Sequence, residues 1–420
     1  MESKFNRGLS FILAVCAILL FGYYEYNDLN ARIIKWQVNA SDNRNLFYPE
    51  EHVENHKVEK AEDKADFTLC AKSALLLDAT SNHVLYEKKG YDELPMASTT
   101  KIMTCIVALE KGKLDDVVTF SKHAASMPDV QLNAKTGAQF TLRDLLYSLM
   151  LESHNDTAVA IAEHVGGSVE GFAKLMNQKA KELGLSHTHF VTPNGLDAEG
   201  HYTTAYDLAR LASYAIQNKK FVEITNTTNW TLTEVGSKST LGVVNKNRFL
   251  SLMQGAIGVK TGFTNNAGYC FVGALKRDGK TLVSVVLGCG WPPHKTYKWR
   301  DTELLMKYGL NHFSYVKINE NLHELYDIPV EKGKTKFCPI TMEKKDETLL
   351  LKNSDQIGII YNIPKTIKAP VQSGQQVGSV KYYINGELYK EVPVMTTKSI
   401  AAVDYRYLLE HIIQLFFSFT

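Results

Sequence analysis

The chain has 420 residues, and its 47 Lys and Arg residues nearly balance its 45 Asp and Glu residues, which gives a formal net charge of +2 at pH 7. This length allows two or three domains of the usual size, roughly 100–200 residues each, with ample hydrophobic core. The balanced charge gives no indication of nucleic-acid binding or of a strongly acidic substrate, and the six scattered cysteines form no Cys-x-x-Cys pair that would indicate a zinc knuckle or a redox dithiol.

The N-terminus has the layout of an export signal. Lys4 and Arg7 precede an apolar run without charges over residues 9–24. This run is shorter than the roughly 20 residues that cross a bilayer as a helix, so residues 1–24 are predicted to be a cleaved signal peptide or a retained anchor. Residues 25–66 are polar and mixed in charge, and we expect a spacer there. The sequence therefore predicts export across the cytoplasmic membrane, with membrane association.

The next part of the chain begins with strands and continues with helices. Short apolar runs at 74–77 and 84–86 predict a hairpin of two strands, and apolar residues at helical spacing follow Ser98. Helical periodicity then dominates over 141–164, with a break between helices at 153–155, and further helices are predicted at 169–183 and, after a polar loop, at 204–217. These patterns predict a helical block inserted after an N-terminal hairpin.

Three β-rich runs follow Gly255, and Asp278-Gly279 is a typical hairpin turn between the last two. Residues 297–308 have the spacing of a closing helix. Strands at both ends with helices between them predict one α/β (α+β) domain over 67–315, in which both ends of the chain build the same antiparallel sheet around a helical insert. Cys270 and Cys289 lie on neighbouring predicted strands, where they form a disulfide or remain buried thiols.

The C-terminal part has a different composition. Pro, Gly, Val and Ile alternate with short apolar runs over 322–394, and Asn385-Gly386 is a hairpin signal, so this region is predicted to be a small β-rich domain. Residues 400–420 contain an amphipathic helix with little charge. This helix either packs on the β-rich domain or lies on a membrane surface.

A possible nucleophile precedes the first long helix. Ser98 stands three residues before Lys101, and positions i and i+3 are neighbours at the start of a helix. A buried lysine with a lowered pKa could accept the serine proton and so activate the hydroxyl. The spacing alone is weak support, because Ser314 and Lys317 have it too.

Two further short motifs follow in order, Ser153-His154-Asn155 at the helix break and Lys260-Thr261-Gly262 at the start of a β run. Both have second copies, at 41–43 and 135–137, but these lie in the spacer and in a polar loop. The ordered set of three motifs is that of penicillin-binding proteins and serine β-lactamases.

The residue types fit acyl transfer. Ser98 would attack an acyl carbon, Lys101 would take its proton, and Ser153 would relay a proton to the leaving amine. The remaining candidates would bind substrate: the amide of Asn155 would contact a peptide, Lys260 and Thr261 would hold a terminal carboxylate, Gly262 would allow close approach to the strand, and the backbone N–H groups of Ser98 and Thr264 would form an oxyanion hole.

The chain resembles the low-molecular-weight penicillin-binding proteins of the serine D-Ala-D-Ala carboxypeptidase family. The resemblance covers about residues 70–394 and is carried by these stretches: Pro95-Met96-Ala97-Ser98-Thr99-Thr100-Lys101-Ile102-Met103-Thr104, Ser153-His154-Asn155-Asp156, Pro193-Asn194-Gly195-Leu196, His201-Tyr202-Thr203-Thr204-Ala205, Gly258-Val259-Lys260-Thr261-Gly262-Phe263-Thr264, Ala369-Pro370-Val371 and Gly374-Gln375-Gln376-Val377-Gly378.

The resemblance implies a serine β-lactamase/transpeptidase-like fold, no metal or other cofactor, and removal of the terminal D-alanine from peptidoglycan stem peptides outside the cytoplasm. It also implies that β-lactams acylate the protein as inhibitors. Two features depart from the family pattern: His154 replaces a glycine common in the family, which would narrow the cleft, and the C-terminal helix is less basic than the usual membrane anchors.

Three alternatives remain. A β-lactamase would need an efficient base for deacylation, and no Glu-x-x-Leu-Asn stretch occurs between Ser153 and Lys260. A β-lactam or muropeptide sensor would use the same residues without turnover. A zinc peptidase would need ligands such as the pairs His52 and His56 or His187 and His189. Both pairs lack the His-Glu-x-x-His pattern and are more typical of surface histidines.

Overall fold

The computed structural model describes residues 66–128, 130–318, 325, 327–343, 348–352 and 354–418. The predicted signal or anchor at 1–24 and all but the last residue of the predicted spacer lie outside these ranges. The chain divides into two compact units, one formed by 63–316 with 348–353, here called the α/β unit, and one that contains 317–347 and 354–420, here called the β unit. Across the described ranges, no helix is both long and apolar enough to cross a membrane.

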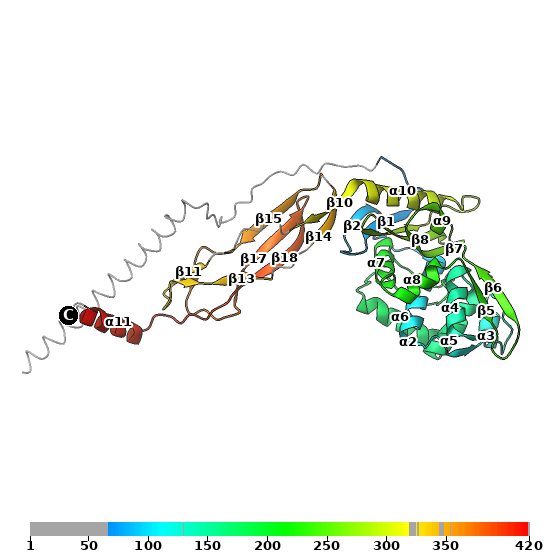
Figure 1. Ribbon diagram of the computed structural model, residues 1–420, viewed down its shortest axis with the longest axis horizontal. Helices are drawn as coiled ribbons and strands as arrows, with labels where there is room; N and C mark the ends of the chain where they lie inside the picture. The colour runs from blue at the N-terminus through cyan, green and yellow to red at the C-terminus, as the bar shows by residue number, and fades with distance from the viewer. Residues whose placement is uncertain are drawn as a thin grey trace, which may run out of the picture. The chain divides into compact units, whose positions relative to one another are not determined.

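A five-stranded antiparallel sheet forms the centre of the α/β unit (Figure 1). The strand order is β2-β1-β9-β8-β7, so β1 from the N-terminal hairpin pairs with β9 from the far end of the unit. The strands are β1 (Ser73–Asp78), β2 (Val84–Lys88), β7 (Ala256–Thr264), β8 (Gly268–Arg277) and β9 (Lys280–Leu287). The prediction that both ends of the chain build one antiparallel sheet is confirmed, and β7 is left at the edge of the sheet.

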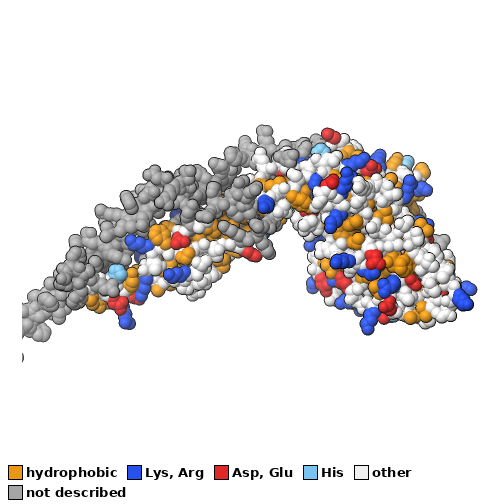
Figure 2. All heavy atoms as spheres, in the orientation of Figure 1, with side chains coloured by type: hydrophobic (Ala, Val, Ile, Leu, Met, Phe, Trp, Pro, Cys, Tyr) orange, Lys and Arg blue, Asp and Glu red, His pale blue; other side chains and the backbone are white. Residues whose placement is uncertain are grey.

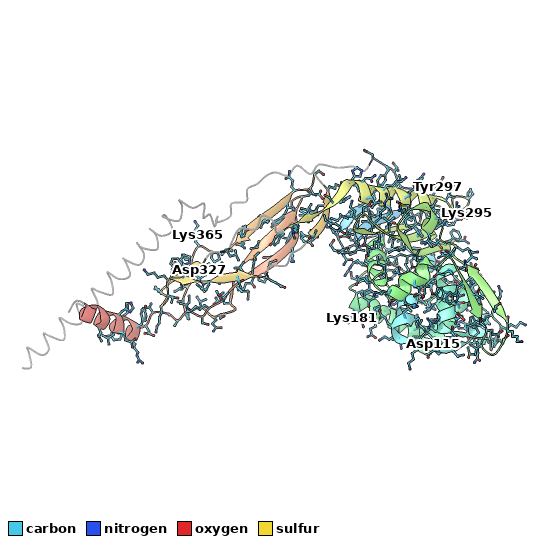
Figure 3. The ribbon with its side chains drawn as sticks, in the orientation of Figure 1. Asp115, Lys181, Lys295, Tyr297, Asp327 and Lys365 are labelled. Atoms are coloured by element: carbon cyan, nitrogen blue, oxygen red, sulfur yellow. The ribbon has the colours of Figure 1, made fainter. Side chains whose placement is uncertain are left out.

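Helices cover both faces of this sheet. The closing helix α10 packs on one face, and the helical block packs on the other (Figure 1). The helices are α2 (Lys101–Lys111), α3 (Lys122–Ala125), α4 (Leu142–Leu151), α5 (Asn155–Gly166), α6 (Val169–Glu182), α7 (Ala205–Ala215), α8 (Lys219–Asn226), α9 (Phe249–Leu252) and α10 (Tyr297–His312), with a 3₁₀ helix η2 (Ala97–Thr100) before α2. In Figure 3, Asp115 and Lys181 lie on the side of the helical block, and Lys295 and Tyr297 lie at the start of α10.

The pleat of β1 explains why every residue of this strand is buried. Side chains alternate between the two faces of a strand, and Leu75 and Leu77 join the core beneath the helical block, whereas Ala74 and Leu76 join the core beneath α10. A strand covered on both faces has a continuous apolar sequence instead of an alternating one. The α/β (α+β) fold class with a helical insert is confirmed.

The helical part of the α/β unit also contains two pairs of strands that the sequence did not predict, the second of them a hairpin. Strands β3 (Val117–Thr119) and β4 (Gln139–Thr141) pair, as do β5 (Asn229–Thr233) and β6 (Thr240–Val244). Most side chains of β5 and β6 are exposed, so the strands lack a strong apolar alternation. The β5–β6 hairpin is held through Trp230, which stacks on Tyr147 with ring centroids 3.9 Å apart and donates from Nε1 to Asp144 Oδ1 at 2.8 Å.

Cys270 and Cys289 are both free, buried thiols, so of the two predicted states the buried thiols are confirmed and the disulfide is not formed. Cys270 belongs to the core beneath the helical block, and Cys289 belongs to the core beneath α10. The two side chains thus belong to cores on opposite faces of the sheet, which keeps the sulfur atoms apart.

The β unit contains short strands, as the composition of 322–394 predicts. Its largest sheet has the order β13-β18-β17-β15 and is antiparallel, and the turn between β17 and β18 carries Asn385 and Gly386 at φ values of 51° and 79°. The strands of this region and the final helix are β11 (Ile328–Glu331), β12 (Phe337–Cys338), β13 (Ile340–Met342), β15 (Ile357–Asn362), β16 (Ile367–Lys368), β17 (Gln376–Ile384), β18 (Glu387–Thr396) and α11 (Tyr405–Ser418). Strand β14 (Thr348–Lys352) pairs instead with β10 (Phe313–Lys317), next to α10 in the α/β unit.

The surface of the α/β unit carries no large region of one charge sign on the face drawn in Figure 2, where basic and acidic side chains are interspersed. This distribution agrees with the near-zero net charge.

Leu76→Ala and Leu77→Ala test the two-sided burial of β1. Both side chains are fully buried, so each substitution is expected to lower the free energy of unfolding by about 2–5 kcal/mol through lost apolar contact and a new cavity. Val117→Ala, at a side chain that is 43% exposed, is the control and should change stability by less than about 0.5 kcal/mol. Denaturant unfolding of the full chain measures all three, and a near-neutral Leu76→Ala would contradict the packing of α10 on this face.

Candidate active site

Ser98 lies in the 3₁₀ helix η2, one turn before α2 begins at Lys101. Residues i and i+3 eclipse each other in a 3₁₀ helix, so the serine and lysine side chains emerge on the same side. The Lys101 Nζ atom lies 2.8 Å from the Ser98 Oγ atom. The contact predicted from the spacing of the two residues is therefore present, and the local helix type makes it closer than an α-helical turn would.

The Lys101 amine has two further partners, and both are pure acceptors. Nζ lies 2.8 Å from Asn155 Oδ1 and 2.6 Å from the Asn194 carbonyl oxygen. The Asn155 atom that faces Lys101 is identified as the oxygen, because the amide nitrogen Nδ2 on the other side donates to the Pro128 carbonyl at 3.1 Å. A neutral amine has two N–H donors and one lone pair, so the two carbonyl oxygens take the donors and the lone pair is left facing the Ser98 hydroxyl.

The surroundings favour this neutral amine. Lys101 is fully buried, and burial is the main cause that lowers its pKa well below that of a free lysine. The second cause is the like charge of Lys260, while Asp156 acts in the opposite direction. Desolvation and a neighbouring cation thus both favour the neutral, basic form of the Lys101 amine.

Ser153 and Asn155 lie where α4 ends and α5 begins, as the predicted helix break requires. Ser153 has a φ value of 72°, in the left-handed region that non-glycine residues rarely adopt. Its hydroxyl oxygen is buried, and within the described residues no hydrogen-bond partner is found for it. Asn155 is held by Lys101, by Pro128 and through its backbone N–H, which donates to the Val130 carbonyl at 2.7 Å.

His154 does not narrow an open cleft, contrary to the expectation from the sequence. Its side chain is buried, with 4% of its surface exposed. The ring atom Nδ1 lies 2.8 Å from Ser148 Oγ, and Nε2 lies 3.4 Å from a Glu152 carboxylate oxygen. Burial lowers the pKa of His154, so the ring is neutral at ordinary pH.

The third motif lies on the edge strand β7, as predicted. Lys260 is almost fully buried, and desolvation lowers its pKa to about 7. Its Nζ atom lies 3.3 Å from the carbonyl oxygen of Thr261, which is a long and therefore weak hydrogen bond. The amine thus keeps N–H groups that can bind a ligand. Thr261 is partly exposed on the same strand.

Gly262 is required because β7 passes directly beside η2. A Cβ atom at this position would lie 3.0 Å from the Ser98 backbone nitrogen and 3.1 Å from that of Thr99. The strand that follows the Lys-Thr-Gly motif therefore runs alongside the backbone N–H of Ser98. Thr264 ends this strand, and its Oγ1 donates to Asp197 Oδ1 at 2.9 Å and accepts from the Ala267 N–H at 3.0 Å.

The residues that support the serine and were not assigned from the sequence come from the loop after α6. The Asn194 carbonyl contacts Lys101 and also lies 3.3 Å from Ser98 Oγ. Gly195 has a φ value of 83°, and a Cβ atom there would lie 2.0 Å from the Ala97 carbonyl oxygen. The stretch 193–196 is a signature in the sequence, but its role could not be read because it acts through backbone atoms.

His201 stabilises η2 through a hydrogen bond to Thr100. Its Nδ1 accepts from the Val191 N–H at 3.0 Å, so Nε2 carries the proton and donates to Thr100 Oγ1 at 2.8 Å. The Thr100 hydroxyl in turn donates to the Ala97 carbonyl at 2.8 Å. Burial lowers the pKa of His201 to about 4, so the ring stays neutral near pH 7. Its Nδ1 atom therefore remains an acceptor and its Nε2 atom a donor.

Two of the second copies of the motifs have other surroundings, and the third, at 41–43, lies outside the described residues. Ser314 and Lys317 lie on strand β10, where residues three apart point to opposite faces, and 135–137 lie in a turn before β4. Among the histidines considered as zinc ligands, His187 contacts Glu93 at 3.1 Å and His189 contacts the Gly200 carbonyl at 2.7 Å.

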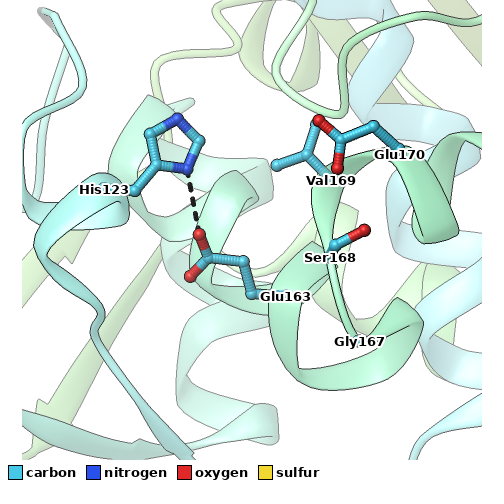
Figure 4. A pocket seen from close by; sticks show the side chains of 6 residues that line it. All are labelled: His123, Glu163, Gly167, Ser168, Val169 and Glu170. Atoms are coloured by element: carbon cyan, nitrogen blue, oxygen red, sulfur yellow. Dashed lines mark hydrogen bonds and ion pairs between the residues drawn. The ribbon is translucent and has the colours of Figure 1, made fainter.

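A separate surface pocket of about 330 Å³ lies at the far end of α5 (Figure 4). It is lined by His123, Glu163, Gly167, Ser168, Val169 and Glu170. Glu163 and Asn155 are eight residues apart on α5, which corresponds to about 12 Å along the helix. The pocket is thus distinct from the cluster around Ser98.

Comparison with known proteins agrees with this geometry. Residues 57–290, more than half of the chain, match the family described as D-alanyl-D-alanine carboxypeptidase, a family of serine peptidases. Residues 313–402 match the family described as penicillin-binding protein 5, C-terminal domain. The chain therefore belongs to the D-alanyl-D-alanine carboxypeptidase family.

Individual relatives cover most of the chain. The D-alanyl-D-alanine carboxypeptidase DacF of Bacillus subtilis is 35% identical over 342 residues, which are 80% of this chain and 87% of that protein. The crystal structure of penicillin-binding protein 5 from Haemophilus influenzae matches 80% of this chain and 98% of its own with a TM-score of 0.65 and 26% identity. The Streptomyces K15 DD-transpeptidase structure matches 58% of this chain and 98% of its own with a TM-score of 0.55 and 34% identity.

Gly195→Ala tests the close contact behind Ser98. The new methyl group would overlap the Ala97 carbonyl, so η2 must shift, and we expect the rate of acylation by penicillin to fall at least about tenfold. Gly200→Ala is the matched control, because Gly200 has a similar φ value of 76° but its nearest neighbouring atom would lie 3.7 Å away. Stopped-flow acylation rates and melting temperatures of both variants give the comparison. Equal losses in both variants would show that backbone strain, not displacement of η2, is responsible.

Proposed function

We propose that this protein is a serine D-alanyl-D-alanine carboxypeptidase that removes the terminal D-alanine from peptidoglycan stem pentapeptides through an acyl-Ser98 intermediate. The observation that carries the proposal is the contact between Lys101 Nζ and Ser98 Oγ, with the other two partners of the amine being carbonyl oxygens. This arrangement presents a base to the hydroxyl without any metal ion.

Acylation begins with attack of Ser98 Oγ on the carbonyl carbon of the penultimate D-alanine. The new C–O bond forms while the hydroxyl proton passes to the Lys101 amine. Negative charge then develops on the substrate oxygen, where the N–H groups of Ser98 and Thr264 would stabilise it. The approach of β7 to the Ser98 nitrogen at Gly262 supports this oxyanion hole.

Collapse of the tetrahedral intermediate breaks the C–N bond and releases D-alanine. The leaving nitrogen needs a proton, and the Ser153 hydroxyl would relay one from Lys101. The buried Ser153 oxygen with its unused hydrogen-bonding capacity supports this role. Water then attacks the ester, Lys101 accepts its proton, and the shortened peptide leaves Ser98 in its original state.

The other candidate residues would orient the peptide. The extended stem peptide would pair along the free edge of β7, as peptides do at exposed sheet edges. Lys260 and Thr261 would bind the terminal carboxylate, and the Asn155 amide would contact the peptide backbone. The β-lactam ring would enter the same site and acylate Ser98, because it presents an amide carbonyl beside a carboxylate.

We further propose that the protein is exported and acts at the outer side of the membrane. The basic residues and apolar run of 1–24 support export, by a cleaved signal peptide or a retained anchor. Helix α11 supports membrane association, because Tyr405, Leu409 and Ile413 recur every fourth residue and are 70%, 36% and 47% exposed. The residues at 25–66 would form a spacer, and 400–420 would contact the lipid surface.

Ser98→Ala tests the proposed reaction. The variant is expected to release D-alanine from diacetyl-L-Lys-D-Ala-D-Ala at least about 10³-fold more slowly than the parent, because the covalent route is lost. Ser314→Ala, at the second copy of the spacing, is the control and should retain the parent rate. Release is measured with a D-amino-acid oxidase assay. A parent protein that releases no D-alanine would support a sensor without turnover instead.

The pKa of Lys260 predicts a pH dependence. Below about pH 7 its amine is protonated and can bind the carboxylate, so kcat/KM is expected to fall as the pH rises through about 7. The guanidinium of Lys260→Arg stays charged, so this falling limb should move up by more than one pH unit even if the maximal rate is lower. The exposed Lys295→Arg is the control. A falling limb that stays near pH 7 in Lys260→Arg would exclude Lys260 as its source.

A further inference from the structure

Ser153 adopts a backbone conformation that its surroundings must impose. A non-glycine residue rarely adopts the left-handed region, and it persists there only where neighbouring contacts determine its conformation. The Ser153 side chain contributes nothing to this, because its oxygen has no partner among the described residues. The restraint must therefore come from the residues on either side.

On the C-terminal side, Asn155 is already fixed by Lys101 and by the carbonyl oxygens of Pro128 and Val130. On the N-terminal side, the carboxylate of Glu152 accepts from the N–H of Val244, the last residue of β6, at 2.9 Å and from Lys246 Nζ, just beyond the strand, at 3.1 Å. These contacts hold the two flanks of the turn, but they leave the peptide units next to Ser153 without a direct tie to α4.

His154 supplies that tie. A carboxylate cannot donate, so the ring nitrogen Nε2 that faces Glu152 carries the proton, and Nδ1 accepts from the Ser148 hydroxyl. Ser148 Oγ lies 3.0 Å from Thr157 Oγ1, so its lone pair is also used. Ser148 and Thr157 are fully buried, and the hydrogen bonds run in one direction from α5 through α4 and the ring to Glu152.

The charged groups around the ring agree with a neutral histidine. Glu152 and Asp156 raise its pKa, Lys101 lowers it, and burial is the largest effect and lowers it. Lys246 lies beyond Glu152 and neutralises that carboxylate. A glycine at this position would leave the Ser148 hydroxyl buried without its acceptor.

We propose that His154 is a positioning residue that ties the Ser153 turn to α4 and thereby fixes the position of the Ser153 hydroxyl. This inference rests on the proposed function for the role of Ser153. It assigns a role to the variable middle residue of the Ser-x-Asn motif, which does not itself act on substrate. The ring touches no substrate in this account. It acts by fixing the geometry of the neighbouring residue.

A double-mutant cycle between His154 and Ser153 tests the proposal. His154→Gly is expected to lower kcat for D-alanine release about tenfold or more with KM nearly unchanged, because a displacement of about 1 Å in a reacting group has effects of this size. In a Ser153→Ala background the same substitution should have no further effect. His154→Gln can accept from Ser148 and donate to Glu152, so it should restore most of the parent rate.

Two controls separate positioning from a general loss of stability. His164→Gly lies on the same helix, on the exposed side, and should change melting temperature without changing kcat. Ser148→Ala removes the hydrogen-bond partner of His154 Nδ1 without changing a residue of the turn itself. This variant should also lower kcat, and it replaces His154→Gly if that variant fails to fold. Equal fold-losses in the Ser153 and Ser153→Ala backgrounds, or no rescue by His154→Gln, would overturn the proposal.

The rate of acylation by penicillin is followed in parallel with peptide turnover. A parent protein that reacts with penicillin but releases no D-alanine would contradict the proposed function. The coupling between His154 and Ser153 would still be read from the acylation rates, so the two failures are distinguishable.

Discussion

The site depends on one buried amine that has only carbonyl and hydroxyl oxygens for partners. Lys101 donates to Asn155 Oδ1 and to the Asn194 carbonyl, and the remaining position on its nitrogen faces Ser98 Oγ. Each of the three contacts comes from a different segment, namely η2, the start of α5 and the loop after α6. Burying the Lys101 side chain would be costly if it carried a charged ammonium group, but it costs much less for a neutral amine. The positive charge of the neighbouring Lys260 further favours the neutral form of Lys101. The fold thus favours a neutral, basic amine chiefly by excluding water from it, against the smaller opposing effect of Asp156.

The rest of the α/β unit serves to bring these segments together without intervening side chains. Gly195 allows the Asn194 carbonyl to approach η2, and Gly262 allows β7 to run beside the Ser98 nitrogen. At both positions a methyl group would push against the turn that carries the nucleophile. Helix α10 and the helical block fix the sheet from its two faces, so the edge strand and the turn keep their separation. The positive φ values of Ala97 and Ser153 place strain on the two turns that carry the serines.

Much of this could be predicted from the sequence, for identifiable reasons. The order of Ser98-x-x-Lys101, Ser153-x-Asn155 and Lys260-Thr261-Gly262 indicated the site, and apolar runs covered on both faces indicated the sheet. The Asn194 carbonyl could not be assigned, since a backbone atom leaves no residue type to recognise. The burial of the His154 side chain was missed because its partners, Ser148 and Glu152, have no distinctive sequence pattern. They contact the histidine ring only because the chain turns at Ser153. The β5–β6 hairpin was missed because exposed strands lack a clear pattern.

The central claim is that Ser98 is the residue that becomes acylated. The most direct measurement is reaction of the full chain with a fluorescent penicillin, followed by proteolysis and mass spectrometry of the labelled peptide. The account predicts a single adduct on Ser98, with a mass increase equal to that of the whole penicillin, since ring opening by a serine loses no atoms. An adduct on any other residue, or no adduct on a folded protein, would contradict it.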